Sequence, residues 1–171
     1  REAERSTVAE SYEQILNDLD FAIANAPDFT VPYRASKTAA KALKARVLLF
    51  MGNYADAAAL ADEVIQSQTR TLAPDFPSVF SEGLNSSEMI FMTHRQSDSD
   101  LEDNNRKRFY SGRTGTTWLP EIMAGDPREE FTYVGSDILK VNNEETFRPT
   151  YYIRLAEMYL IKAEALAELG D

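Results

Sequence analysis

The sequence contains no cysteine and a single histidine, His94. The absence of cysteine excludes disulfide bonds, zinc thiolate sites and cysteine nucleophiles. One histidine is too few for a histidine-based metal cluster, and no catalytic triad can be assembled around it. We therefore expect no metal site of these kinds and no cofactor.

Positive charge is scarce, and long hydrophobic runs are missing. The chain of 171 residues has 18 lysines and arginines against 28 acidic residues, a net charge of −10. Because no basic patch or stripe is visible, nucleic acid is not an expected partner. No apolar run approaches the roughly 20 residues that a membrane-spanning helix needs. The length suffices for one domain with a sizeable core.

The clearest pattern present is a helical hairpin in residues 36–67. Ser36 is a good N-cap, and alanine, leucine, lysine and arginine keep helix propensity high as far as Met51. Gly52 can adopt the left-handed conformation that ends a helix, and Asn53 can cap the next one. A turn this short folds two helices antiparallel.

Small residues are expected where these two helices touch, at Ala45, Ala57 and Ala61. Their spacing is typical of a tetratricopeptide repeat, although a plain helical hairpin shows part of the same pattern. The matching positions are Ala45, Leu48, Gly52, Tyr54 and Ala57.

Two further helices are predicted, in residues 6–26 and 151–169. On the repeat template, the first matches the back half of one repeat and the last matches the front half of another. We therefore expect a piece of a longer protein, whose end helices pack on each other or mediate dimerisation. The apolar residues that would otherwise partly face water are Val8, Ile15, Leu19, Leu155, Tyr159 and Leu166.

The region between the hairpin and the last helix is broken up by prolines and glycines. Residues 88–93 are the best candidate for a strand, and residues 117–124 for a short helix. A region of this length without clear periodicity is usually a functional insertion. The predicted fold is thus mainly α, a tetratricopeptide-like helical hairpin scaffold with an irregular insertion containing short strands. The predicted organisation is one domain, 1–171, with repeat helices in 6–67 and 151–171 and an insertion in 68–150.

Catalytic and metal sites have weak support in this sequence. The pairs Asp98 with Asp100 and Glu129 with Glu130 could serve as glycosidase carboxylates, but such pairs are common among 28 acidic residues. The acidic stretch 98–103 could bind calcium, but it lacks the glycine and spacing of an EF-hand, and a plain acidic loop is the favoured interpretation. We predict that the protein is not an enzyme.

A sugar site needs an aromatic face for the ring and planar polar groups for the hydroxyls. Trp118, the single tryptophan, follows Tyr110 and Arg113 in a polar stretch, and these three are the candidate ligand-binding residues. The alternative is that Trp118 packs under its own loop as local core. Two further pairings, Arg154 with Glu157 and Asp126 with Arg128, are expected to hold structure rather than ligand.

Four segments resemble one known family. Residues 154–165, RLAEMYLIKAEA, resemble the R-L-A-E-x-Y-L-x-x-A-E-A signature of the SusD/RagB family of outer-membrane nutrient-binding lipoproteins. Residues 45–57 are similar to its A-R-x-x-L-x-x-G-x-Y-x-x-A pattern, residues 87–91 to its S-E-x-I-F strand, and residues 126–128 to its D-x-R element. The order of the four segments is also that of the family.

The resemblance implies a tetratricopeptide-like scaffold that holds an oligosaccharide or peptide nutrient and passes it to a TonB-dependent outer-membrane porin. It implies a location at the cell outer membrane, facing the surface. Family members are about three times longer than this chain, and their lipid-bearing cysteine and C-terminal part are absent from it. A helical-repeat module for protein–protein interaction and a non-functional truncated remnant remain the alternatives.

Overall fold

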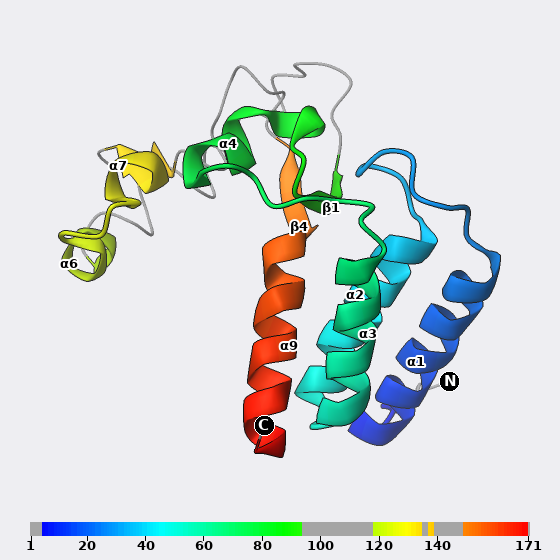
Figure 1. Ribbon diagram of the computed structural model, residues 1–171. Coiled ribbons are helices and arrows are strands. Elements are labelled where there is room, and N and C mark those ends of the chain that lie inside the picture. Colours follow the sequence, from blue (N-terminus) through cyan, green and yellow to red (C-terminus); the bar gives the residue numbers. More distant parts are fainter. Residues whose placement is uncertain (1–4, 94–117, 135–136, 139–148, 171) are drawn as a thin grey trace.

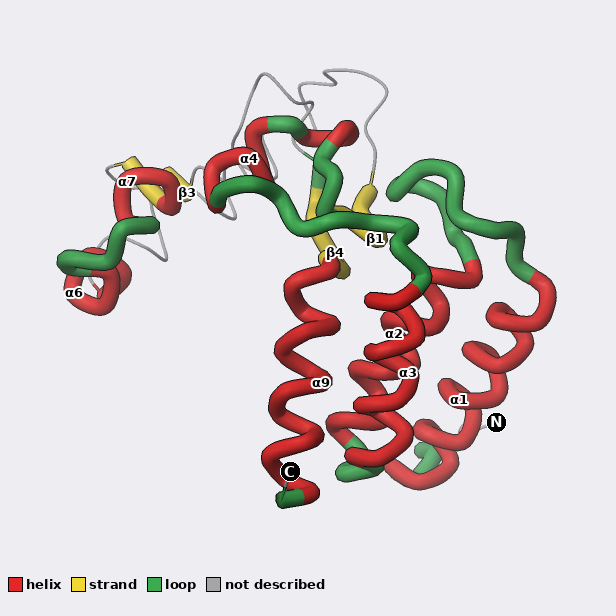
Figure 2. Tube along the Cα trace, viewed as in Figure 1, coloured by secondary structure: helices red, strands yellow, loops and turns green. Residues whose placement is uncertain are grey.

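The computed structural model describes residues 5–93, 118–134, 137–138 and 149–170. Within these ranges the protein is mainly helical, with two small antiparallel sheets of two strands each. This confirms the predicted fold class. Four long helices lie side by side, and short helices and strands gather at one end of them (Figures 1 and 2).

The long helices are α1 (Val8–Asn25), α2 (Lys37–Phe50), α3 (Tyr54–Gln66) and α9 (Leu155–Leu169). The short helices are α4 (Phe76–Ser81), η1 (Gly83–Asn85), α6 (Trp118–Met123) and α7 (Glu129–Thr132). The strands are β1 (Met89–Thr93), β2 (Tyr133–Val134), β3 (Asp137–Ile138) and β4 (Thr150–Arg154). No helix of the described residues is both long and apolar enough to cross a membrane.

Helix α1 begins at Val8 rather than at Ser6, because Thr7 and Glu10 form a capping box. The Thr7 hydroxyl accepts the Glu10 backbone N–H at 3.2 Å, and the Glu10 carboxylate accepts the Thr7 backbone N–H at 2.8 Å. Two backbone donors that the first helical turn cannot satisfy are thereby paired.

The hairpin of α2 and α3 follows the sequence prediction closely. The Ser36 hydroxyl accepts the Ala39 backbone N–H at 3.2 Å, and Gly52 ends α2 in the left-handed conformation with φ of +75°. Asn53 occupies the N-cap position of α3, but its side chain makes no capping hydrogen bond. The short turn therefore depends on the glycine rather than on both residues.

The main core lies where α3 packs between α2 and α9. Ala45, Ala57 and Ala61 are fully buried there, as the repeat pattern predicted, and they let the helix axes approach. The other buried members of this core are Ala39, Ala42, Leu48, Ala58, Val64, Ile90, Ile153, Leu155, Met158, Ile161 and Ala165.

Helix α9 begins at Leu155, not at Tyr151 as predicted. The preceding residues 150–153, threonine, two tyrosines and isoleucine, are β-branched or aromatic and form strand β4 together with Arg154. This strand pairs antiparallel with β1, with Met89 opposite Arg154 and Thr93 opposite Thr150. The predicted strand at 88–93 is therefore present, and its partner lies in residues that were expected to be helical.

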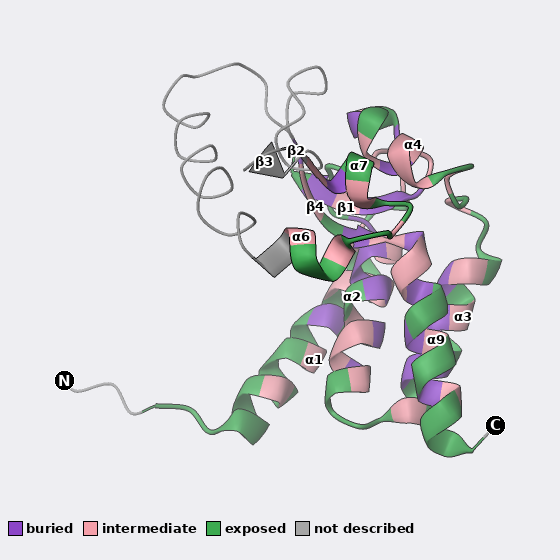
Figure 3. Cartoon of the chain, turned by 90° about the vertical axis from the view of Figure 1, so that its left-hand side faces the viewer, coloured by how far each residue is buried: buried purple, intermediate pink, exposed green. Residues whose placement is uncertain are grey.

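The two end helices lie at opposite sides of the layer, since α1 packs on α2 and α9 packs mainly on α3 (Figure 1). The expectation that they pack on each other is therefore wrong. Val8 is 73% exposed and Tyr159 45% exposed, as anticipated, whereas Leu19 and Leu155 are buried. Figure 3 shows that most of α1 is exposed and that buried residues lie along α2 and α9.

An ion pair joins each neighbouring pair of long helices. These ion pairs help to fix the relative orientation of helices whose contacts are made largely by small alanine side chains. Partly exposed pairs of this kind contribute only modestly to stability. The pairs are Asp20–Lys44 between α1 and α2, Lys41–Glu63 between α2 and α3, Arg46–Glu157 between α2 and α9, and Asp62–Lys162 between α3 and α9.

A buried carboxylate, Glu88, ties three separate segments together. Its backbone carbonyl accepts the Leu155 N–H at 3.0 Å, at the start of α9. Its side chain accepts the Ala73 N–H at 3.2 Å and lies 3.5 Å from the Arg154 guanidinium. Glu88 is 3% exposed, so these contacts replace part of the hydration that a carboxylate would otherwise require. Its Oε1 faces the Arg154 charge but accepts no hydrogen bond among the described residues.

Candidate functional site

The predicted ligand-binding residues fall at the edge of the described chain. Trp118 is the first residue of α6, and the backbone of this helix leads directly to the turn before α7. Tyr110 and Arg113 lie outside the described residues, as do His94 and the acidic stretch 98–103. The candidate site is therefore built from the segment that begins at Trp118 and continues to Tyr133.

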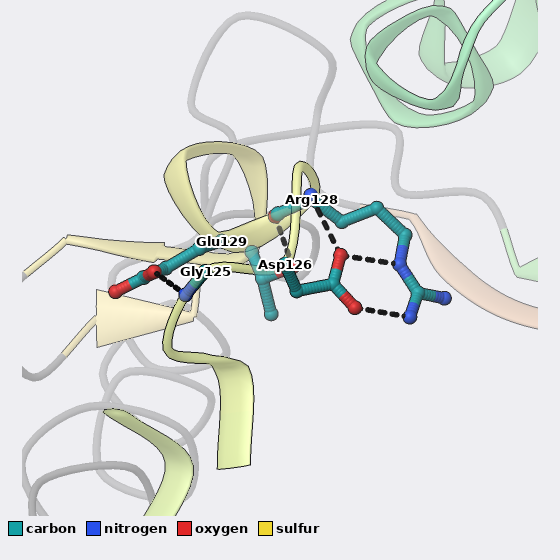
Figure 4. Close-up of polar contacts among 5 residues, drawn as sticks. Gly125, Asp126, Arg128 and Glu129 are labelled. Carbon is teal, nitrogen blue, oxygen red and sulfur yellow. Dashed lines mark hydrogen bonds and ion pairs between the residues drawn. The ribbon is translucent and has the colours of Figure 1, made fainter. Parts of the chain in front are cut away.

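A tight turn connects α6 to α7. Gly125 has φ of +79°, a conformation that favours glycine, and the Asp126 N–H donates to the Met123 carbonyl at 2.8 Å. Arg128 then folds back on Asp126. Its backbone N–H donates to Oδ1 at 2.8 Å, and its guanidinium donates to both carboxylate oxygens at 2.9 and 2.5 Å (Figure 4).

Glu129 fixes the other side of the same turn. One carboxylate oxygen accepts the Gly125 N–H at 3.3 Å (Figure 4), and the other accepts the Tyr133 hydroxyl at 2.8 Å. The hydrogen bond to Glu129 raises the pKa of the Tyr133 phenol. Since both oxygens of Glu129 serve to hold the turn, its arrangement is that of a structural acceptor rather than of a catalytic base.

A shallow pocket of about 360 Å³ lies against this turn, lined by Asp126, Pro127, Glu129, Glu130 and Tyr133. Its walls offer one aromatic ring and three carboxylates. Among the contacts of the described residues, Glu130 accepts no hydrogen bond, so it can accept from a ligand hydroxyl. Among the residues that the structure describes, no group of three or more histidine or acidic side chains is placed to hold a metal ion.

The bidentate contact with Arg128 lowers the pKa of Asp126 to about 2. We expect a carboxyl titration followed by NMR to show this midpoint, and Arg128→Gln to move it toward the ordinary value of 3.8. Because the folded pKa lies below the unfolded one, the stabilising contribution is present above about pH 4 and is lost as the pH falls toward 2. An unchanged midpoint in the Arg128→Gln protein would contradict this assignment.

Of the two pairs expected to hold structure, Asp126 with Arg128 and Arg154 with Glu157, only the first forms. Asp126 and Arg128 do pair, but Arg154 pairs with Glu88 and Glu157 pairs with Arg46, not with each other. The reason is that Arg154 belongs to strand β4 while Glu157 lies in the first turn of α9. Sequence reasoning missed the role of Tyr133, although its spacing of four residues after Glu129 could have indicated a contact.

Two family models match the chain. One, described as starch-binding and associating with the outer membrane, matches residues 1–49. The other, a model of the SusD family, matches residues 111–171. No curated protein matches the chain.

Solved structures share the fold over nearly the whole chain. A SusD superfamily protein from Bacteroides vulgatus ATCC 8482 is 25% identical with a TM-score of 0.79, over 98% of this chain and 44% of that protein. A SusD superfamily protein from Bacteroides thetaiotaomicron VPI-5482 is 23% identical with a TM-score of 0.77, over 97% and 44%. A laminarin-binding SusD-like protein is 24% identical with a TM-score of 0.68, over 94% and 50%.

This chain thus spans about half or less of the length of these relatives. Two separate SusD models, which together cover more than half of the chain, agree with the fold and with the order of the four sequence segments. The two family models and the shared fold together support the assignment of this chain to the SusD/RagB family.

Proposed function

We propose that this chain is part of a protein that binds a glycan nutrient at the outer-membrane surface and passes it to a TonB-dependent transporter. The observation that carries the proposal is the match to SusD family models, one of which is described as starch-binding. A similar solved structure is a laminarin-binding protein. These matches support a binding role rather than an enzymatic one.

The ligand site that we propose is the insertion around α6 and α7, with Trp118, Tyr110 and Arg113 as binding residues. A tryptophan ring can cover the apolar face of a sugar, and an arginine can donate to its hydroxyls. The pocket beside α7 supplies Glu130 as an acceptor and Tyr133 as a second ring. Helices α6 and α7 lie apart from the four long helices (Figure 1).

Calorimetric titration of the chain with laminarin and with starch fragments tests this proposal. We expect Trp118→Ala to weaken binding at least tenfold, a loss of about 1.4 kcal/mol. Tyr159→Ala is the matched control, since Tyr159 is a 45% exposed aromatic residue on α9, outside the insertion. Equal affinities of the two variants would contradict the site, and binding of peptides but of no glycan would contradict the ligand class.

The transporter is tested separately. A TonB-dependent porin encoded beside this gene, and its co-purification with the full-length protein from outer-membrane fractions, are the expected results. A full-length protein confined to the cytosolic fraction would contradict both the location and the transfer step.

A further inference from the structure

The irregular region between α3 and α9 attaches to the helical scaffold in two different ways. Its first part, residues 68–93, belongs to the scaffold. Val79, Met89 and Met92 are buried in a second core beside the long helices, and this core also packs against Tyr151 of β4. The Tyr151 hydroxyl donates a hydrogen bond to the Phe80 carbonyl at 3.2 Å, and the rings of Tyr151 and Phe80 pack edge to face.

The part that follows β1 behaves differently. None of the described residues 118–134 is a member of either hydrophobic core. Within the described chain, the hydrogen bonds and ion pairs of this stretch join its own residues, as between Asp126 and Arg128 or Glu129 and Tyr133. Helices α6 and α7 accordingly lie beside the scaffold rather than within it (Figures 1 and 3).

The chain leaves and re-enters the scaffold at one residue pair of the β1–β4 sheet. Thr93, the last residue of β1, is the antiparallel partner of Thr150, the first residue of β4. The Thr150 N–H also donates to the Thr93 hydroxyl at 3.3 Å. Two residues paired in this way can be joined by a short hairpin turn, whatever length of chain separates them in the native sequence.

We propose that the scaffold of residues 5–93 and 150–170 folds without residues 94–149, which are therefore separable from it. The boundary lies at Thr93 and Thr150 rather than at the ends of the whole irregular region. All members of both cores are retained in the scaffold, as are the ion pairs between long helices and the contacts of Glu88 with other described residues. The excised stretch does include Pro149, a fully buried residue directly before β4. The inference does not depend on the ligand.

The test is a protein in which Asn-Gly replaces residues 94–149, with a second version carrying a four-residue Gly-rich turn in case the hairpin register needs more room. We expect a cooperative thermal transition, a helical circular dichroism spectrum and a melting midpoint within about 5 °C of the unaltered chain. The matched control removes residues 76–85, which carry buried Val79, and should lose cooperative melting.

Non-cooperative melting in both excised versions would overturn the inference, as would an excised protein no more cooperative than the 76–85 deletion. Glycan binding by the same proteins tests the proposed function independently. A folded excised protein that still binds glycan would refute the binding site in the insertion, while leaving the separability of the unit supported.

Discussion

Glu88→Ala is expected to lower the free energy of unfolding by about 3 kcal/mol. The substitution leaves the Ala73 N–H without its acceptor and Arg154 without its counter-ion. Breaking a buried ion pair typically costs about 3–5 kcal/mol. The low end applies here because the Arg154 side chain is 35% exposed and can be partly hydrated.

Urea unfolding at neutral pH measures this loss of stability, and two further variants serve as comparisons. Glu88→Gln keeps an acceptor for the Ala73 N–H but removes the charge, so we expect an intermediate loss. Glu63→Ala also breaks an ion pair, with Lys41, but its carboxylate is 57% exposed, and the cost should stay below about 1 kcal/mol. Similar losses for Glu88→Ala and Glu63→Ala would show that Glu88 does not link the segments.

Ala61→Leu is expected to destabilise the scaffold by about 3 kcal/mol or to abolish folding. Ala61 is fully buried in the main core, on the helix that packs between α2 and α9. Three extra carbon atoms must push one of these helices away, and overpacking of a filled core costs about 1–3 kcal/mol or more.

The matched control is Ala59→Leu on the same helix, since Ala59 is exposed. It makes the same chemical change where no neighbour is crowded, and its effect should stay within about 0.5 kcal/mol. Thermal and urea unfolding of both proteins give the comparison. An Ala61→Leu protein as stable as the control would mean that α3 has room to move against its neighbours.

The helical scaffold was predictable because its signals are local. Ser36 and Gly52 act within one turn of the helix they bound, and the buried alanines recur at helical spacing. Strand β4 was missed because its apolar residues continue directly into α9, so that periodicity alone gave one long helix. Its assignment depends on pairing with β1, a contact between residues more than 50 positions apart.

The candidate site was less accessible to sequence reasoning. The Asp126–Arg128 pair could be anticipated because its residues lie only two positions apart in one turn. The pocket could not be anticipated, since it depends on how α7 and the start of β2 orient Glu130 and Tyr133. Trp118 is a candidate because it is the single tryptophan, and its part in ligand binding is a prediction that the titrations above can decide.

The packing of α9 on α3 has a consequence for how fast the protein folds. The Asp62–Lys162 pair closes a loop of 100 residues, and the entropy lost on closing a loop grows with its length. Removing residues 94–149 shortens this loop to about 46 residues and lowers the closure cost by roughly 0.7 kcal/mol. Because mostly local contacts favour rapid folding, the shortened scaffold should reach its native state sooner than the chain from which it was cut.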